Sequence, residues 1–123
     1  MAVGINIKED SLQAHIVKTL RKLKALRRLD FVIGMQGIRL QPYQRNRIKS
    51  QGMESGQPDI LILMPKGKMI AIELKVGKNK PQPNQLDCHD LWRELGYDVH
   101  LVTTSCLDDG LNQVIGIING IIS

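Results

Sequence analysis

Two carboxylates and a lysine occupy neighbouring apolar segments, at a spacing that could support phosphodiester chemistry. Pro58-Asp59 opens one segment, and Glu73-Leu74-Lys75 lies inside the next one. Carboxylate oxygens are the ligands that Mg²⁺ and Mn²⁺ prefer, and an ammonium group beside them can act on a water or a phosphate. Charged groups in such apolar surroundings are costly unless they serve a purpose. The combination predicts the metal-assisted site of a nuclease.

Both segments are predicted to be β-strands. Asp59–Met64 and Met69–Val76 are rich in β-branched and other apolar residues, and the turn between them contains Pro65 and Gly67. Side chains alternate between the two faces of a strand, so Glu73 and Lys75 should point the same way. The residues that alternate with them should face a hydrophobic core: Ile70, Ile72, Leu74 and Val76.

Helices and further strands are expected on both sides of this hairpin. Gln85 should stand in the first turn of a helix whose apolar face comprises Cys88, Leu91, Trp92 and Leu95. His89 lies one turn later and could border the site, although a half-buried position is the simpler expectation. The expected elements are a helix from Asp10 or Ser11 to about Leu29, a strand Phe31–Met35, a loop Gln41–Gly56, a helix Asn84–Leu95 capped by Asn84, a strand Asp98–Thr103 and a final helix from Leu111.

The pattern resembles the VRR-NUC family of the PD-(D/E)xK nuclease superfamily. The likeness is carried by Gly-Met-Glu-Ser-Gly-Gln-Pro-Asp at 52–59, by Ile-Glu-Leu-Lys at 72–75 and by Gln85, and it spans about 9–104. Glu9 fits the acidic residue that this family carries on its first helix. The resemblance implies an α/β fold with an αβββαβ core and a mixed central sheet flanked by helices. It also implies one domain over 1–123, of the short stand-alone type found in phages and bacteria.

Each site residue then acquires an expected role. Asp59 and Glu73 would bind Mg²⁺ or Mn²⁺, and the resemblance adds the backbone carbonyl of Leu74 as a metal ligand. Lys75 would orient the attacking water. Glu9 would bind the metal or one of its waters, and Gln85 would contact a phosphate or position Lys75. The alternatives are an ordinary first-turn acid at Glu9 and an incidental surface pair at Glu73 and Lys75.

The charge of the chain is concentrated in one part of it. Residues 1–80 contain 16 of the 17 Lys and Arg but only six of the 12 acidic residues, which indicates a polyanionic partner. Aromatic residues are 3% of the chain, too few for a protein that binds single strands by stacking bases. The backbone of duplex or branched DNA is therefore the expected ligand. The loop 41–56 is expected to bind that phosphate backbone, and the alternative is a flexible surface loop that binds nothing. The candidate phosphate contacts are Arg45, Arg47, Lys49, Lys78 and Lys80.

We expect a metal-dependent, structure-specific DNA endonuclease that resolves four-way (Holliday) junctions as a homodimer, because two sites about a two-fold axis match the symmetry of such a junction. The alternatives are a flap or general nicking endonuclease, a non-catalytic nucleic-acid-binding module, and a subunit targeted by a partner. The uncharged tail 111–123 could pack on its own domain or form the dimer interface. The start of the chain lacks the pattern of a signal peptide, and no segment is apolar over the length of a membrane span, so a cytoplasmic location in a bacterial or phage-infected host cell is expected.

Overall fold

The sheet at the centre of the protein has four strands. The computed structural model describes residues 7–26, 29–34, 41–51 and 56–122, without the side chains of Arg45, Ile48, Lys49 and Ile122. The strands are β1 (Asp30–Ile33), β2 (Ile60–Met64), β3 (Lys68–Val76) and β4 (Asp98–Thr104). The helices are α1 (Glu9–Ala25), α2 (Pro42–Ser50), α3 (Pro83–Glu94) and α4 (Leu107–Ile122), with a 3₁₀ turn, η2, at Pro65–Gly67.

The strand order in the sheet is β1-β2-β3-β4. Strands β1, β2 and β3 are joined by antiparallel pairing, whereas β3 and β4 are parallel. A parallel pair needs a crossover connection, and α3 provides it. The mixed sheet flanked by helices confirms the α/β fold class with its αβββαβ core.

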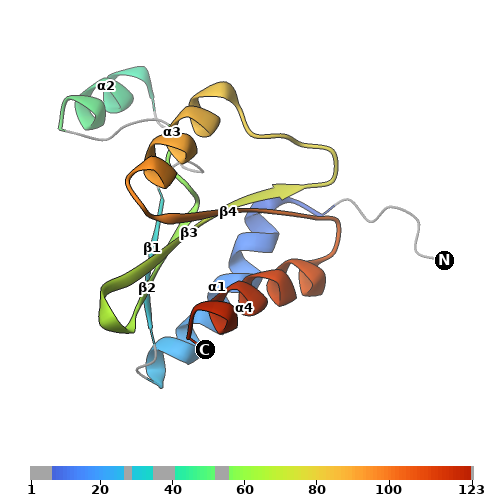
Figure 1. Ribbon diagram of the computed structural model, residues 1–123. Helices are drawn as coiled ribbons and strands as arrows, with labels where there is room; N and C mark the ends of the chain where they lie inside the picture. The colour runs from blue at the N-terminus through green and yellow to red at the C-terminus, as the bar shows by residue number, and fades with distance from the viewer. Residues whose placement is uncertain (1–6, 27–28, 35–40, 52–55, 123) are drawn as a thin grey trace.

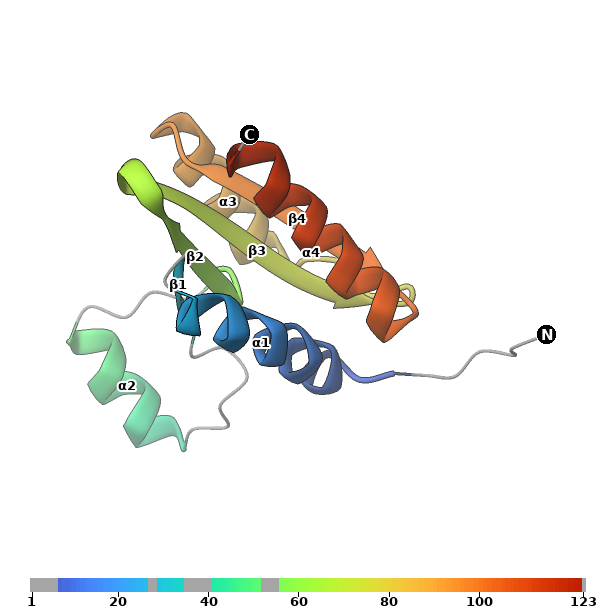
Figure 2. The same cartoon turned by 90° about the horizontal axis from the view of Figure 1, so that it is seen from below.

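The two faces of the sheet are covered differently. Helices α1 and α4 lie side by side on one face, and α3 lies on the other (Figures 1 and 2). The strand alternation predicted for β3 holds, because Ile70, Ile72 and Leu74 belong to the hydrophobic core together with buried side chains of α1 and α4. The polar residues of β3 that alternate with them are thereby directed away from this core.

The C-terminal helix packs against α1 and β4. Val114 and Ile118 are buried within the core, and Gly110 allows close approach, since a Cβ there would lie 2.5 Å from a methyl carbon of Leu12. Packing on its own domain is therefore observed for this part of the tail 111–123. No helix within the described residues is long and apolar enough to cross a membrane.

Several element boundaries differ from the sequence-based expectation. Helix α1 begins at Glu9, because two acids in its first turn suit the positive end of the helix dipole, and it ends at Ala25 instead of Leu29. The strand β1 ends at Ile33, and Met35 is outside the described residues. The expected loop 41–56 contains α2, which stands apart from the sheet (Figures 1 and 2). Its sequence has little apolar periodicity, so the pattern of residues does not indicate a helix there.

Candidate active site

The β2–β3 hairpin brings the two predicted acidic residues together. Ile60 pairs with Ile72, so Asp59, which directly precedes β2, lies next to Glu73. The Asp59 Oδ2 accepts a 2.7 Å hydrogen bond from the backbone N–H of Leu74. This bond fixes the Asp59 carboxylate against β3 and leaves its other oxygen for a further ligand.

Glu73 and Lys75 are far more buried than a surface ion pair would be. Glu73 is 1% exposed and Lys75 is 8% exposed, so the alternative of an incidental surface pair is wrong. The Lys75 Nζ lies 3.6 Å from Glu73 Oε2 and 3.7 Å from Glu9 Oε1. Glu9 reaches this position because it begins α1 at the end of the sheet where Asp59 and Lys75 lie. One ammonium group therefore links carboxylates of β3 and α1.

Gln85 connects helix α3 to the same cluster. The N-cap of α3 is Gln82 and not Asn84, and Gln85 occupies the third helical position in a capping box. Its Oε1 accepts the backbone N–H of Gln82 at 2.7 Å, which turns its Nε2 toward Glu73 Oε2 at 3.1 Å. Gln85 thus contacts Glu73, where the sequence suggested a phosphate or Lys75.

Burial dominates the electrostatics of the acidic pair. Desolvation, followed by the charge of Asp59, raises the pKa of Glu73 to about 8. Desolvation also raises the pKa of Asp59, although the Leu74 N–H and the Lys75 charge oppose this shift. Two carboxylates that resist ionising side by side would be stabilised by a divalent cation between them.

The residues present fit such a cation. Glu73 Oε1 is buried and has no hydrogen-bond partner among the described residues. Within the same part of the chain no group of three or more His, Cys, Asp and Glu is arranged to hold a metal. Two carboxylates and the Leu74 carbonyl are nevertheless enough for Mg²⁺, which usually keeps several waters and takes substrate phosphate oxygens as well.

The six predicted site residues line one cavity of about 220 Å³, together with Asp10 and Gln13. At about 30 Å³ for each water in the liquid, this space holds several water-sized groups. A hydrated cation with a phosphate group is of a size that this space can accept. The cavity residues predicted from the sequence are Glu9, Asp59, Glu73, Leu74, Lys75 and Gln85.

Three of the predicted phosphate contacts, Lys78, Lys80 and Arg47, are not among the residues that line this cavity. Lys78 and Lys80 are exposed on the connection that follows β3, a few residues beyond Lys75. Arg47 is exposed on α2. The side chains of Arg45 and Lys49 are outside the described residues.

His89, which could border the site by its place one turn after Gln85, contacts Glu73, and the half-buried position expected for it is wrong. It is 2% exposed, and its Nε2 lies 3.4 Å from Glu73 Oε1. The predicted apolar face of α3 is wrong in part, since Leu91 and Leu95 are exposed while Gln85 and His89 are buried. The four-residue spacing of Gln85 and His89, which puts both side chains on one helix face, was the available signal.

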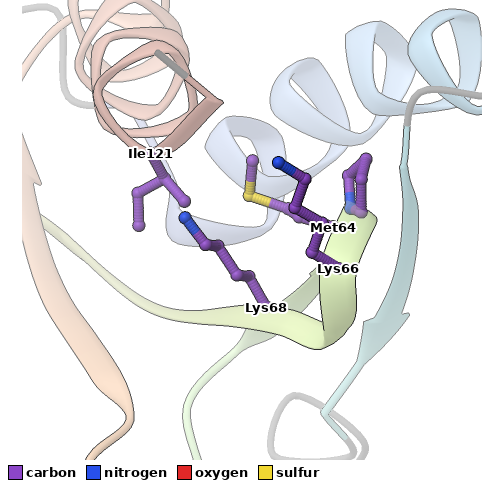
Figure 3. Close-up of a pocket in the computed structure, with 5 residues that line it drawn as sticks. Met64, Lys66, Lys68 and Ile121 are labelled. Carbon is purple, nitrogen blue, oxygen red and sulfur yellow. The ribbon is translucent and has the colours of Figure 1, made fainter.

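A second hollow lies at the opposite end of the hairpin. In Figure 3, Lys66 and Lys68 approach Met64 and Ile121 there, and Pro65 completes the lining. Its volume is about 90 Å³, and its lining includes none of the acidic residues of the β2–β3 pair.

Comparison with known proteins points in one direction. No family model matches the chain. A protein of Acyrthosiphon pisum secondary endosymbiont phage 1, named "Putative nuclease p44", is 29% identical over 108 residues, which are 88% of this chain and 96% of that protein. A solved VRR_NUC domain has a TM-score of 0.58 at 23% identity, covering 90% of this chain and 94% of its own. A VRR_NUC domain protein has a TM-score of 0.64 at 17% identity, covering 93% and 90%.

Proposed function

Because the chain has the fold of VRR-NUC domains, as its sequence motifs indicated, we propose that it is a metal-dependent endonuclease that hydrolyses phosphodiester bonds in DNA. The observation that carries this proposal is the cluster of Asp59 with the buried Glu73 and Lys75, in which Glu73 Oε1 has no hydrogen-bond partner among the described residues, because a buried polar group of this kind is costly to keep without a use. The phage protein named as a nuclease, which this chain matches over most of its length, supports the same activity.

Each residue of the site has its own proposed role in hydrolysis. Asp59, Glu73 and the Leu74 carbonyl would hold Mg²⁺ or Mn²⁺, which when bound supplies an acidified water and positive charge near the phosphate. Lys75 would orient the attacking water and hold its hydroxide form by donating a hydrogen bond. Glu9 would keep the Lys75 ammonium in place through the ion pair between them. Gln85 would hold the Glu73 carboxylate in the orientation that binds the cation.

DNA is the proposed substrate because of the charge distribution. The structure has exposed positive charge at Lys78, Lys80 and Arg47. The sequence has two further basic residues beside Arg47, which are Arg45 and Lys49. Such cations bind phosphates without reading bases. A single compact site of this kind favours recognition of DNA shape over DNA sequence.

We further propose that the chain resolves four-way junctions as a homodimer, with flap cleavage or general nicking as the second candidate activity. One active site cleaves one DNA strand, so two symmetric cuts in a junction require two copies of the chain. Analytical ultracentrifugation of the whole chain tests the dimer. Deleting 111–123 would be uninformative, because Val114 and Ile118 belong to the core.

The substrate assay compares a labelled four-way junction, a flap and a linear duplex, each in Mg²⁺, Mn²⁺ and EDTA. Paired nicks in the junction alone, lost in EDTA and in Asp59→Asn, are the expected result. Metal-dependent cutting of every substrate would leave a nicking endonuclease in place of a resolvase. Salt-sensitive binding without cleavage in either metal would contradict the enzymatic proposal and favour a binding module.

A further inference from the structure

One ring nitrogen of His89 and one carboxylate oxygen of Glu73 lie close together inside the protein, each without a hydrogen bond in the described structure. The Nε2 of His89 and the Oε1 of Glu73 are both buried, and neither has a hydrogen-bond partner among the described residues. They are 3.4 Å apart, slightly longer than a well-formed N–H···O bond of about 2.7–3.2 Å. A small rotation of either side chain would close the gap.

The other oxygen of Glu73 is already engaged. Oε2 accepts the amide N–H of Gln85 and lies 3.6 Å from the Lys75 ammonium. Leaving the buried Oε1 without a donor would cost on the order of 1–3 kcal/mol. Within the described residues, the nitrogen that lies opposite Oε1 is the Nε2 of His89, at 3.4 Å.

The local sequence explains why α3 can supply this donor. Gln85 and His89 are four residues apart, so both project from the same face of α3, one turn after the other. A neutral histidine ring carries a single N–H, on either Nδ1 or Nε2. A neutral ring with its proton on Nε2 would place a donor opposite a carboxylate oxygen.

We propose that His89 is a positioning residue that donates its Nε2–H to Glu73 Oε1, so that α3 holds both oxygens of this carboxylate from two successive turns. Held in this way, Glu73 keeps a fixed orientation while its remaining lone pairs stay available. The consequence for metal binding rests on the proposed function, because only a site that takes a divalent cation would gain affinity from this orientation.

The first test measures the tautomer of His89 and does not depend on nuclease activity. In ¹⁵N NMR spectra of the metal-free protein at pH 9, His89 should carry its proton on Nε2. A proton on Nδ1 would overturn the proposal, because Nε2 would then have nothing to donate.

The second test measures Mn²⁺ affinity by calorimetry on DNA-free protein. His89→Leu removes the donor and should weaken Mn²⁺ binding about 10- to 100-fold. His89→Gln can place an amide N–H near the same point and should stay within about threefold of the wild-type value, which a purely packing role for the ring would not produce. His100→Leu, the same change on β4, is the matched control. Wild-type affinity in His89→Leu would overturn the proposal.

Failure of this inference can be separated from failure of the proposed function. If the wild type neither binds Mn²⁺ nor cleaves DNA, the enzymatic proposal fails, while the tautomer of His89 still decides whether it holds Glu73. If the wild type binds Mn²⁺ and His89→Leu binds it equally well, the nuclease proposal stands and the role of His89 is contradicted.

Discussion

At the scale of single residues, the strongest conflict between burial and charge is at Glu73. Its pKa is raised from an ordinary value of 4.5 to about 8, first by desolvation and then by the Asp59 charge. Between these pH values the folded protein binds a proton that the unfolded chain has released. Folding is therefore favoured at the acidic end of this range, and that advantage is lost as pH rises toward 8.

We predict that the free energy of unfolding of the metal-free protein falls as pH rises from about 4.5 to 8, by at most about 1.4 kcal/mol per pH unit for one proton. Urea denaturation in EDTA across this range measures it. Glu73→Gln, which cannot ionise, should remove most of the slope, whereas the exposed Glu94→Gln should keep it. Equal slopes in Glu73→Gln and the wild type would contradict the assignment.

Lys75 should matter to the reaction more than to the fold. Lys75→Met keeps most of the buried stem and removes the ammonium group that contacts Glu73 and Glu9. We expect single-turnover cleavage to fall about 10²- to 10⁴-fold, the usual contribution of a positioned proton-transfer group, without loss of folded structure by circular dichroism. Lys68→Met, an exposed lysine at the other end of β3, should cleave like the wild type.

The sequence predicted Asp59, Glu73 and Lys75 because charged residues are easy to recognise within the apolar, alternating pattern of a strand. It favoured a half-buried His89 over one that borders the site, because the apolar residues of α3 set the expected orientation of the helix. Leu91 and Leu95 are exposed, and the helix turns two polar residues inward to meet Glu73. A polar site can thus reverse the orientation that hydrophobic patterning favours.

At the scale of elements, Gly56 lets the segment before Asp59 approach the start of α3. Its φ is +88°, and a Cβ there would lie 2.4 Å from the carbonyl oxygen of Asn84. Both the backbone conformation and the contact require glycine. The positions of Asp59 and Gln85 relative to each other therefore depend on Gly56, which lies outside both β2 and α3.

We predict that Gly56→Ala destabilises the protein by about 2 kcal/mol or more and lowers cleavage. Gly116→Ala is the matched control, since that glycine lies within α4 with nothing within 4 Å of the added methyl group. It should be neutral or stabilising by up to about 1 kcal/mol. Thermal unfolding of both variants measures the difference, and equal effects would contradict the role given to Gly56.

The order of the elements was predictable, whereas some of their ends were not. The hairpin, α3 and β4 follow from turn residues and periodicity in the sequence. Helix α2 lacks an apolar stripe, and the cap of α3 is a Gln82–Gln85 pair, a rarer form of the capping box than one begun by Ser or Thr. The sequence patterns that indicate a helix or its first residue were therefore weak at α2 and at the start of α3.

At the scale of the whole molecule, exposed positive charge near the cavity should set DNA affinity. Lys78 and Lys80 follow directly after the strand that carries Lys75. Replacing both with Ala should weaken binding to all DNA sequences and reduce the slope of log K against log salt by about 0.9 for each lost phosphate contact. The double change at Lys66 and Lys68, at the far end of the hairpin, should leave the slope unchanged. Fluorescence anisotropy over a salt series measures both, and equal slopes in the two double variants would contradict this orientation of the DNA.

The most direct test of the proposed metal site is cleavage of supercoiled plasmid DNA by the wild type, Glu73→Gln and Glu94→Gln, in Mn²⁺ and in EDTA. We predict nicking by the wild type and Glu94→Gln in Mn²⁺ alone, with at least about 100-fold less by Glu73→Gln. Nicking by Glu73→Gln at the wild-type rate, or nicking that survives EDTA, would contradict a metal-dependent site built on Asp59, Glu73 and Lys75.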